Sequence, residues 1–130
     1  MGTDTRDVNQ IIDDDLAVLT GFGITAEQLA QRMRIITEKA EPGLGTWVKI
    51  DDNLRAMTIG AKGALTCPWP HPGRFNKIVT TAERIDSGQN LRWSDLSIHL
   101  IEEHGFFQGK GSTFRLEPDK LIKVILQDML

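Results

Sequence analysis

The sequence predicts an α+β fold, in which a small antiparallel sheet of three to four strands packs with about four helices in the order ααβββαα. Three observations lead to this prediction. Both ends of the chain show helical periodicity, the middle holds short runs of β-branched and aromatic residues, and those runs are too close together for βαβ crossovers. The 130 residues fit one domain, with an N-terminal helical hairpin at about 6–41, a β meander at about 46–93 and C-terminal helices at about 94–130.

The N-terminal hairpin contains two expected helices. The first spans Arg6–Thr20, and the acidic run Asp13–Asp15 lies largely off its apolar stripe, which favours a solvated face. Thr25, with Gln28 three residues later, forms a capping box that begins the second helix, and Pro42-Gly43 ends it. Because the surrounding chain is acidic, we expect an ordinary αα-hairpin rather than a DNA-binding helix-turn-helix.

The middle of the chain contains three strand-like runs, at Thr46–Ile50, Leu54–Ile59 and Phe75–Thr81. Turn residues separate them, first at Asp51-Asp52-Asn53 and then at Gly60-Ala61-Lys62-Gly63. This spacing predicts an antiparallel meander, with room for a fourth strand before residue 93.

The C-terminal part begins with the most clearly marked helix of the chain, from Ser94 to His104. Ser94 is a suitable N-cap with Ser97 at N3, and Gly105 suits the left-handed position after the last turn. Pro118 begins a final helix. Its apolar residues are crowded enough to support a homodimer: Leu121, Ile122, Val124, Ile125, Leu126, Met129 and Leu130.

Charge and composition limit the classes of partner. The net charge is −3, and the middle third is only slightly basic, with seven basic and five acidic residues in 41–92. Nucleic acid is therefore not favoured. The single cysteine, Cys67, excludes an internal disulfide, and no secretory signal or membrane-spanning run is evident. These features favour a cytoplasmic protein without a membrane partner.

The helix Ser94–His104 suggests a metal site. Its pattern Leu96-x2-His99-x4-His104 is similar to the helix half of a Cys2His2 zinc finger, over about ten residues. With Cys67 and His71 upstream, it implies a four-ligand zinc site, but not a finger fold or DNA binding. The chain departs from the pattern because it has one upstream cysteine and 27 residues between His71 and His99. Helical geometry also places His99 outward and His104 inward unless the last turn changes. The alternative is a solvated His99 and a His104 beside the helix end.

Alternating prolines at Pro68, Pro70 and Pro72 predict an extended or turned loop. A binding loop built on this segment would use Trp69 and His71, with Arg74 and Lys110 as further contacts. The alternative places Trp69 over the sheet as a lid on the core.

No complete catalytic signature is present, so an enzyme is the less favoured class. The sequence favours a small intracellular interaction or regulatory domain, non-enzymatic, with another protein or a second copy as partner. The alternative is a zinc-binding protein that contacts nucleic acid. Because the chain has no tyrosine, aromatic anchoring depends on Trp47, Trp69 and Trp93.

Overall fold

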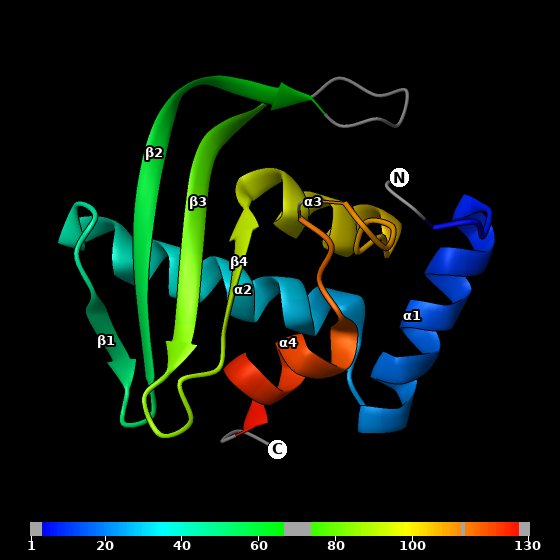
Figure 1. Ribbon diagram of the computed structural model, residues 1–130, viewed down its shortest axis with the longest axis horizontal. Helices are drawn as coiled ribbons and strands as arrows, with labels where there is room; N and C mark the ends of the chain where they lie inside the picture. The colour runs from blue at the N-terminus through cyan, green and yellow to red at the C-terminus, as the bar shows by residue number, and fades with distance from the viewer. Residues whose placement is uncertain (1–3, 67–73, 113, 128–130) are drawn as a thin grey trace.

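The computed structural model describes residues 4–66, 74–112 and 114–127, and it confirms the α+β prediction with four strands (Figure 1). Helices α2, α3 and α4 contact the sheet, and α1 lies at the far end of the helical layer, against α4. The elements run in chain order: α1 (Val8–Phe22), α2 (Ala26–Ala40), the 3-10 turn η1 (Glu41–Gly43), β1 (Val48–Asp51), β2 (Leu54–Thr66), β3 (Arg74–Arg84), β4 (Asn90–Ser94), α3 (Asp95–His104) and α4 (Pro118–Ile125). No helix in the described part of the chain is long and apolar enough to cross a membrane.

The sheet has the order β1-β2-β3-β4, and every neighbouring pair is antiparallel. Its longest pairing joins β2 to β3, from Leu54 opposite Arg84 to Thr66 opposite Arg74. The turn predicted at Gly60–Gly63 is wrong, because β2 continues through it with a shift in register between Ala61 and Ala64. Pairing with β3 keeps these glycines in the strand, and the shift absorbs the local preference for a turn.

The hydrophobic core lies between the inner face of the sheet and α2, α3 and α4. Trp93 of β4 is fully buried there, so it does not serve as an exposed anchor. Its indole N–H donates to Thr37 Oγ1 of α2 at 3.0 Å, and Thr37 Oγ1 lies 2.9 Å from Thr80 Oγ1 of β3. This buried polar chain joins the second helix to the neighbouring strands β3 and β4.

In helix α1 the predicted solvent exposure of the acidic run is wrong at one residue. Asp15 is buried, although the run Asp13–Asp15 was expected to form a solvated face. Its carboxylate accepts two hydrogen bonds from the Arg115 guanidinium, one of them at 2.9 Å from Nη2 to Oδ1. The partner lies 100 positions away in the chain, so helical periodicity alone gives no sign of it.

Helix α3 has the predicted ends. Ser94 accepts from the Ser97 backbone N–H, and Ser97 accepts from the Ser94 backbone N–H, which makes a capping box. At the other end Gly105 adopts φ 62°, and its N–H donates to the Ile101 carbonyl at 3.0 Å. The capping box of α2 at Thr25 and Gln28 is likewise confirmed.

Helix α4 begins at Pro118 as predicted and is held tightly within the chain. Its described apolar side chains all pack into the core: Leu121, Ile122, Val124, Ile125 and Leu126. Over residues 118–127, therefore, the helix presents no apolar face for the homodimer that its sequence suggested. Met129 and Leu130 lie outside the described residues.

Candidate functional site

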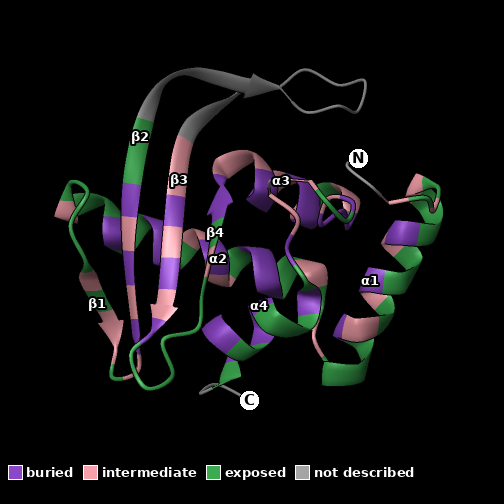
Figure 2. Ribbon diagram, viewed as in Figure 1, coloured by how far each residue is buried: buried purple, intermediate pink, exposed green. Residues whose placement is uncertain are grey.

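Three large apolar side chains are exposed in the loop before β1 and on the neighbouring strand β2. Leu44 is 90% exposed, Ile59 58% and Trp47 38%, and we call these three residues the edge patch. Figure 2 shows the loop before β1 as exposed. Monomeric proteins rarely group exposed apolar residues in this way without a binding role.

The backbone explains why these side chains are exposed. β1 pairs with β2 only between Leu54 and Ala56, so the edge of β2 from Met57 onward has no strand beside it among the described residues. Leu44 follows η1 with φ 49°, in the left-handed region that non-glycine residues rarely occupy. Beyond Ala56, the loop before β1 lies beside β2 instead of a strand, and Gly45 approaches the Thr58 carbonyl.

A hollow of about 320 Å³ lies between the Leu44 loop and β2. Leu44 and Ile59 form its apolar sides, and Glu41 is the carboxylate among its lining residues. The complete lining is Glu41, Leu44, Gly45, Thr58, Ile59 and Gly60. Its volume leaves room for an apolar side chain of a partner.

The outer face of the sheet continues the edge patch toward β3. Arg55 lies over the Trp47 ring, with its guanidinium carbon 4.2 Å from the ring centroid, and Arg55 Nε donates to Glu83 at 3.0 Å. Cation–π and ion-pair contacts fix the arginine, so it holds Trp47 in place from one side. The indole ring is therefore a rigid anchor with low ordering cost.

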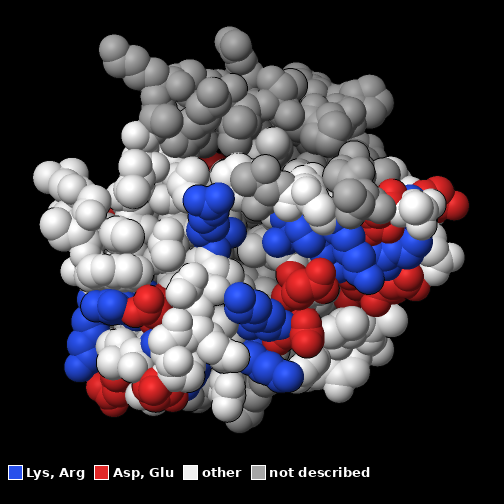
Figure 3. All heavy atoms as spheres, viewed as in Figure 1, with Lys and Arg blue, Asp and Glu red and all other residues white. Residues whose placement is uncertain are grey.

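Charge is distributed unevenly around this region. Residues 54–82, which include most of β2 and β3, contain four Lys or Arg residues and no Asp or Glu. Figure 3 shows basic and acidic side chains close together at the lower left, more acidic side chains toward α1, and a mostly uncharged left margin above the lower-left group. Among the described side chains, Arg55 is paired with Glu83 of β3 and Glu41 lines the hollow, so the edge patch is mainly apolar in character.

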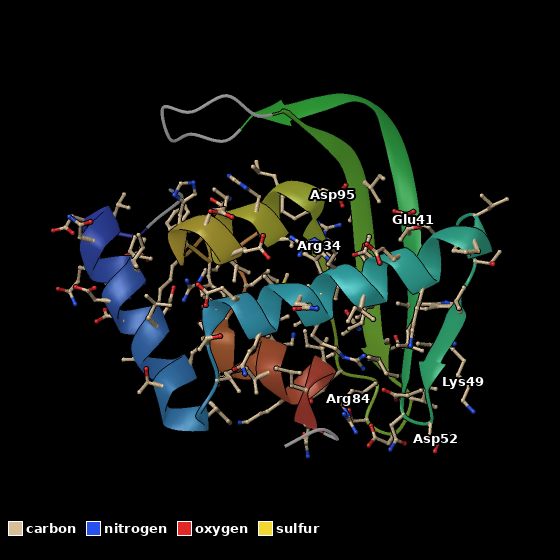
Figure 4. All side chains as sticks on the ribbon, turned by 180° about the vertical axis from the view of Figure 1, so that it is seen from behind. Arg34, Glu41, Lys49, Asp52, Arg84 and Asp95 are labelled. Atoms are coloured by element: carbon tan, nitrogen blue, oxygen red, sulfur yellow. The ribbon has the colours of Figure 1, made fainter. Side chains whose placement is uncertain are left out.

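A second hollow, of about 390 Å³, separates α2 from α3. Arg34 crosses it to Glu102 with two hydrogen bonds of 3.0 Å, and this pairing raises the pKa of Arg34. Asp95 and Glu41 stand at the same cleft (Figure 4). Burial raises the pKa of Asp95, Glu41 raises it further, and Arg34 opposes the change. The cleft is acidic, with Glu38 completing its carboxylates.

Arg32 and Arg34 of α2, which a helix-turn-helix would present to DNA, are engaged within the chain. Arg34 binds Glu102, and Arg32 donates to Asp51 and to the Ile125 carbonyl, both at 3.1 Å. These contacts support the αα-hairpin interpretation of the N-terminal region.

Of the predicted zinc ligands, the structure describes two. The rings of His99 and His104 meet edge to face with centroids 5.3 Å apart, so the expectation that they point to opposite sides is wrong. Cys67 and His71 lie outside the described residues. Within the described residues, no group of three or more His, Cys, Asp or Glu is arranged to hold a metal ion.

The predicted binding loop is only partly described. Trp69 and His71 lie outside the described residues, and Arg74 is placed by its backbone at the start of β3. Lys110 is exposed in the segment after α3, and its backbone N–H donates to Asp4 at 3.1 Å. The prediction that these residues form one binding loop is not tested by the described residues.

Comparison with known proteins finds no relative: no family model, no curated protein and no solved structure matches the chain. The functional interpretation therefore rests on the fold and on the surfaces described above.

Sequence reasoning named Trp47 as an anchor but missed Leu44 and Ile59. The sequence predicts Ile59 at the end of a strand and gives no sign of its exposure. One signal was present: the segment Pro42–Gly45 puts a leucine between turn residues, where a buried position is uncommon.

Proposed function

We propose that the chain is a cytoplasmic, non-enzymatic interaction domain that binds another protein at the edge patch. The observation that supports it is the exposure of Leu44 and Ile59 on the two sides of one hollow, with a further exposed aromatic residue, Trp47, just before β1. Tryptophan and apolar side chains that enter a pocket commonly carry most of the binding energy at protein interfaces. Isolated apolar residues on a surface carry no such meaning.

The chemistry of the patch favours a protein over a nucleic acid. Glu41 lines the hollow, and the net charge of the chain is −3, so the surface as a whole does not attract phosphate. In the described α2–α3 cleft, two of the polar side chains are engaged within the fold. The Thr37 hydroxyl bonds with Trp93 and Thr80, and Arg34 pairs with Glu102.

Site-specific photo-crosslinking in the native cell tests the proposal. A benzoylphenylalanine at Leu44 should give an adduct of defined mass that is sensitive to protease and resistant to nuclease. The matched control is the same amino acid at Ile85, which is 49% exposed in the turn after β3. Equal yields at the two positions would show that the edge patch has no partner of its own.

Zinc binding is a second candidate, favoured by the meeting of the His99 and His104 rings. Two imidazoles side by side provide half of a tetrahedral zinc site, and Cys67 and His71 would complete it. Protein purified without chelator should then contain one zinc ion per chain by elemental analysis, and His99→Ala should lower that content. Absence of stoichiometric zinc in the unmodified protein removes this candidate.

A further inference from the structure

We infer that the protein bound at the edge patch presents a basic side chain, lysine or arginine, to the acidic cleft between α2 and α3, while a neighbouring apolar residue occupies the hollow between Leu44 and Ile59. The inference rests on the proposed function and specifies the chemistry of the partner segment. At such a surface apolar burial provides affinity, and the charge contact provides specificity and faster association.

Glu41 makes the two hollows neighbours. It is a lining residue of both the α2–α3 cleft and the hollow beside Leu44 and Ile59. It is also the first residue of η1, directly after the end of α2, and Figure 4 shows it with Arg34 and Asp95 around the cleft. A partner segment that places an apolar residue between Leu44 and Ile59 therefore has the cleft next to it.

The cleft has more carboxylates than its own arginine neutralises. Four of its lining residues are acidic: Glu38, Glu41, Asp95 and Glu102. Arg34 is engaged with Glu102 through two hydrogen bonds of 3.0 Å. In the described part of the chain, no lysine or arginine lies within ion-pair distance of the other three carboxylates. An added cation therefore meets carboxylates that are not already paired.

Asp95 is the carboxylate that gains most from an added cation. Burial raises its pKa, and the charge of Glu41 raises it further against the opposing effect of Arg34. The ionised carboxylate is thus destabilised where it stands, and a guanidinium or ammonium group within hydrogen-bond reach would stabilise it. The cleft, of about 390 Å³, leaves room for such a group.

The charge of the surrounding surface also favours a basic partner. The chain carries a net charge of −3, Glu41 lines the hollow of the edge patch, and the guanidinium of Arg55 is paired with Glu83. A basic segment is therefore attracted during its approach as well as in contact. A second copy of the chain is the poorer occupant, because both copies carry the same net charge.

Selection of displayed random peptides on the full-length protein tests this inference. We expect the selected peptides to share a lysine or arginine close to an apolar residue. Their affinity for the unmodified protein should fall with added salt, because salt screens the charge contact. Enrichment of peptides without a basic residue would overturn the inference.

Variants of the cleft then test where the basic side chain binds. The double variant Glu38→Gln/Asp95→Asn removes two charges from the cleft and keeps the pair of Arg34 and Glu102. Dissociation constants of the selected peptides should rise at least about fivefold in this variant. Replacing the basic residue of the peptide with methionine should then cost little further affinity, because the two changes remove the same contact.

The matched control for this variant is Glu27→Gln/Asp119→Asn. It makes the same two changes at exposed positions in the first turns of α2 and α4, outside the lining of both hollows. Because the net charge changes equally, the control isolates the position of the carboxylates, and we expect a change below about twofold. Equal losses of affinity in the two double variants would overturn the inference.

Ile59→Ser separates this inference from the proposed function, with Ile85→Ser as its control at a comparably exposed isoleucine. We expect binding of the selected peptides to depend on both Ile59 and the cleft carboxylates. Dependence on Ile59 alone overturns the inference and leaves the proposed function intact. Dependence on the carboxylates alone, or on neither, overturns both, because the edge patch then takes no part in binding.

Discussion

The indole N–H of Trp93 donates a 3.0 Å hydrogen bond to the Thr37 hydroxyl inside the core. The same hydroxyl lies 2.9 Å from that of Thr80, and all three side chains are buried. A buried polar group is tolerated only when it is hydrogen-bonded. This chain therefore links α2 to β3 and β4 and sets the position of the helical layer under the sheet.

Replacing Thr37 with valine should destabilise the fold by about 1–3 kcal/mol, because it leaves the buried Trp93 N–H without this acceptor. Chemical denaturation measures the change. Thr20→Val is the control, since the Thr20 hydroxyl donates to the Leu16 carbonyl at an exposed position of α1. This variant should lose less than about 0.5 kcal/mol of unfolding free energy. Equal losses in the two variants would contradict the structural role of the Trp93 bond.

The buried pair of Asp15 and Arg115 joins α1 to the segment before α4. Burial opposes the charge on Arg115, but the hydrogen bonds that Arg115 donates to Asp15 and Glu117 raise its pKa above the ordinary value. Arg115→Met alone should cost about 3–5 kcal/mol, because Asp15 is left buried without this partner. The double variant Asp15→Leu/Arg115→Met should recover much of that loss. A double variant as unstable as the sum of the single changes would show that the two residues act separately.

The raised pKa of Asp95 makes stability depend on pH. Burial, with Glu41, favours the protonated carboxyl in the folded state, so ionisation costs folding free energy as the pH rises from 3.8 through the raised pKa. Asp95→Asn removes this cost. The variant should therefore gain stability relative to the unmodified protein as the pH rises through that window, and then level off. Free energies of unfolding measured from pH 3 to 7 check this, and a relative loss over the same range would refute it.

Two left-handed glycines allow a matched test of helix ends. Gly23 and Gly105 have φ of 74° and 62°, so alanine is strained at both. An added Cβ at Gly23 meets nothing within 4 Å, whereas at Gly105 it would lie 3.2 Å from Leu16 Cδ1. Each change should cost about 1 kcal/mol of backbone strain, and Gly105→Ala should lose more because Leu16 must move. Thermal unfolding of both variants measures the difference, and a smaller loss at Gly105 would contradict this packing.

Features determined by near neighbours in the chain were predictable. The capping boxes at Thr25 and Ser94, the left-handed Gly105 and the start of α4 at Pro118 all follow from residues within one helical turn. The fold class was predictable as well, because helical and strand periodicity are patterns among near neighbours in the chain.

Features that depend on distant residues were not predictable. The burial of Asp15 requires Arg115, and the continuation of β2 through Gly60 requires β3. The edge patch depends on where β1 ends beside β2, which no local pattern determines. The meeting of His99 and His104 depends on side-chain geometry at the end of α3 that a regular helical projection does not capture.

The most direct test of a binding role for the edge patch uses the partner crosslinked at Leu44. Its dissociation constant should be measured for the unmodified protein, for Ile59→Lys and for Ile85→Lys, two substitutions at comparably exposed isoleucines. We expect binding to weaken at least about tenfold for Ile59→Lys and to stay nearly unchanged for Ile85→Lys. Equal affinities of the two variants would contradict the edge patch as the binding surface.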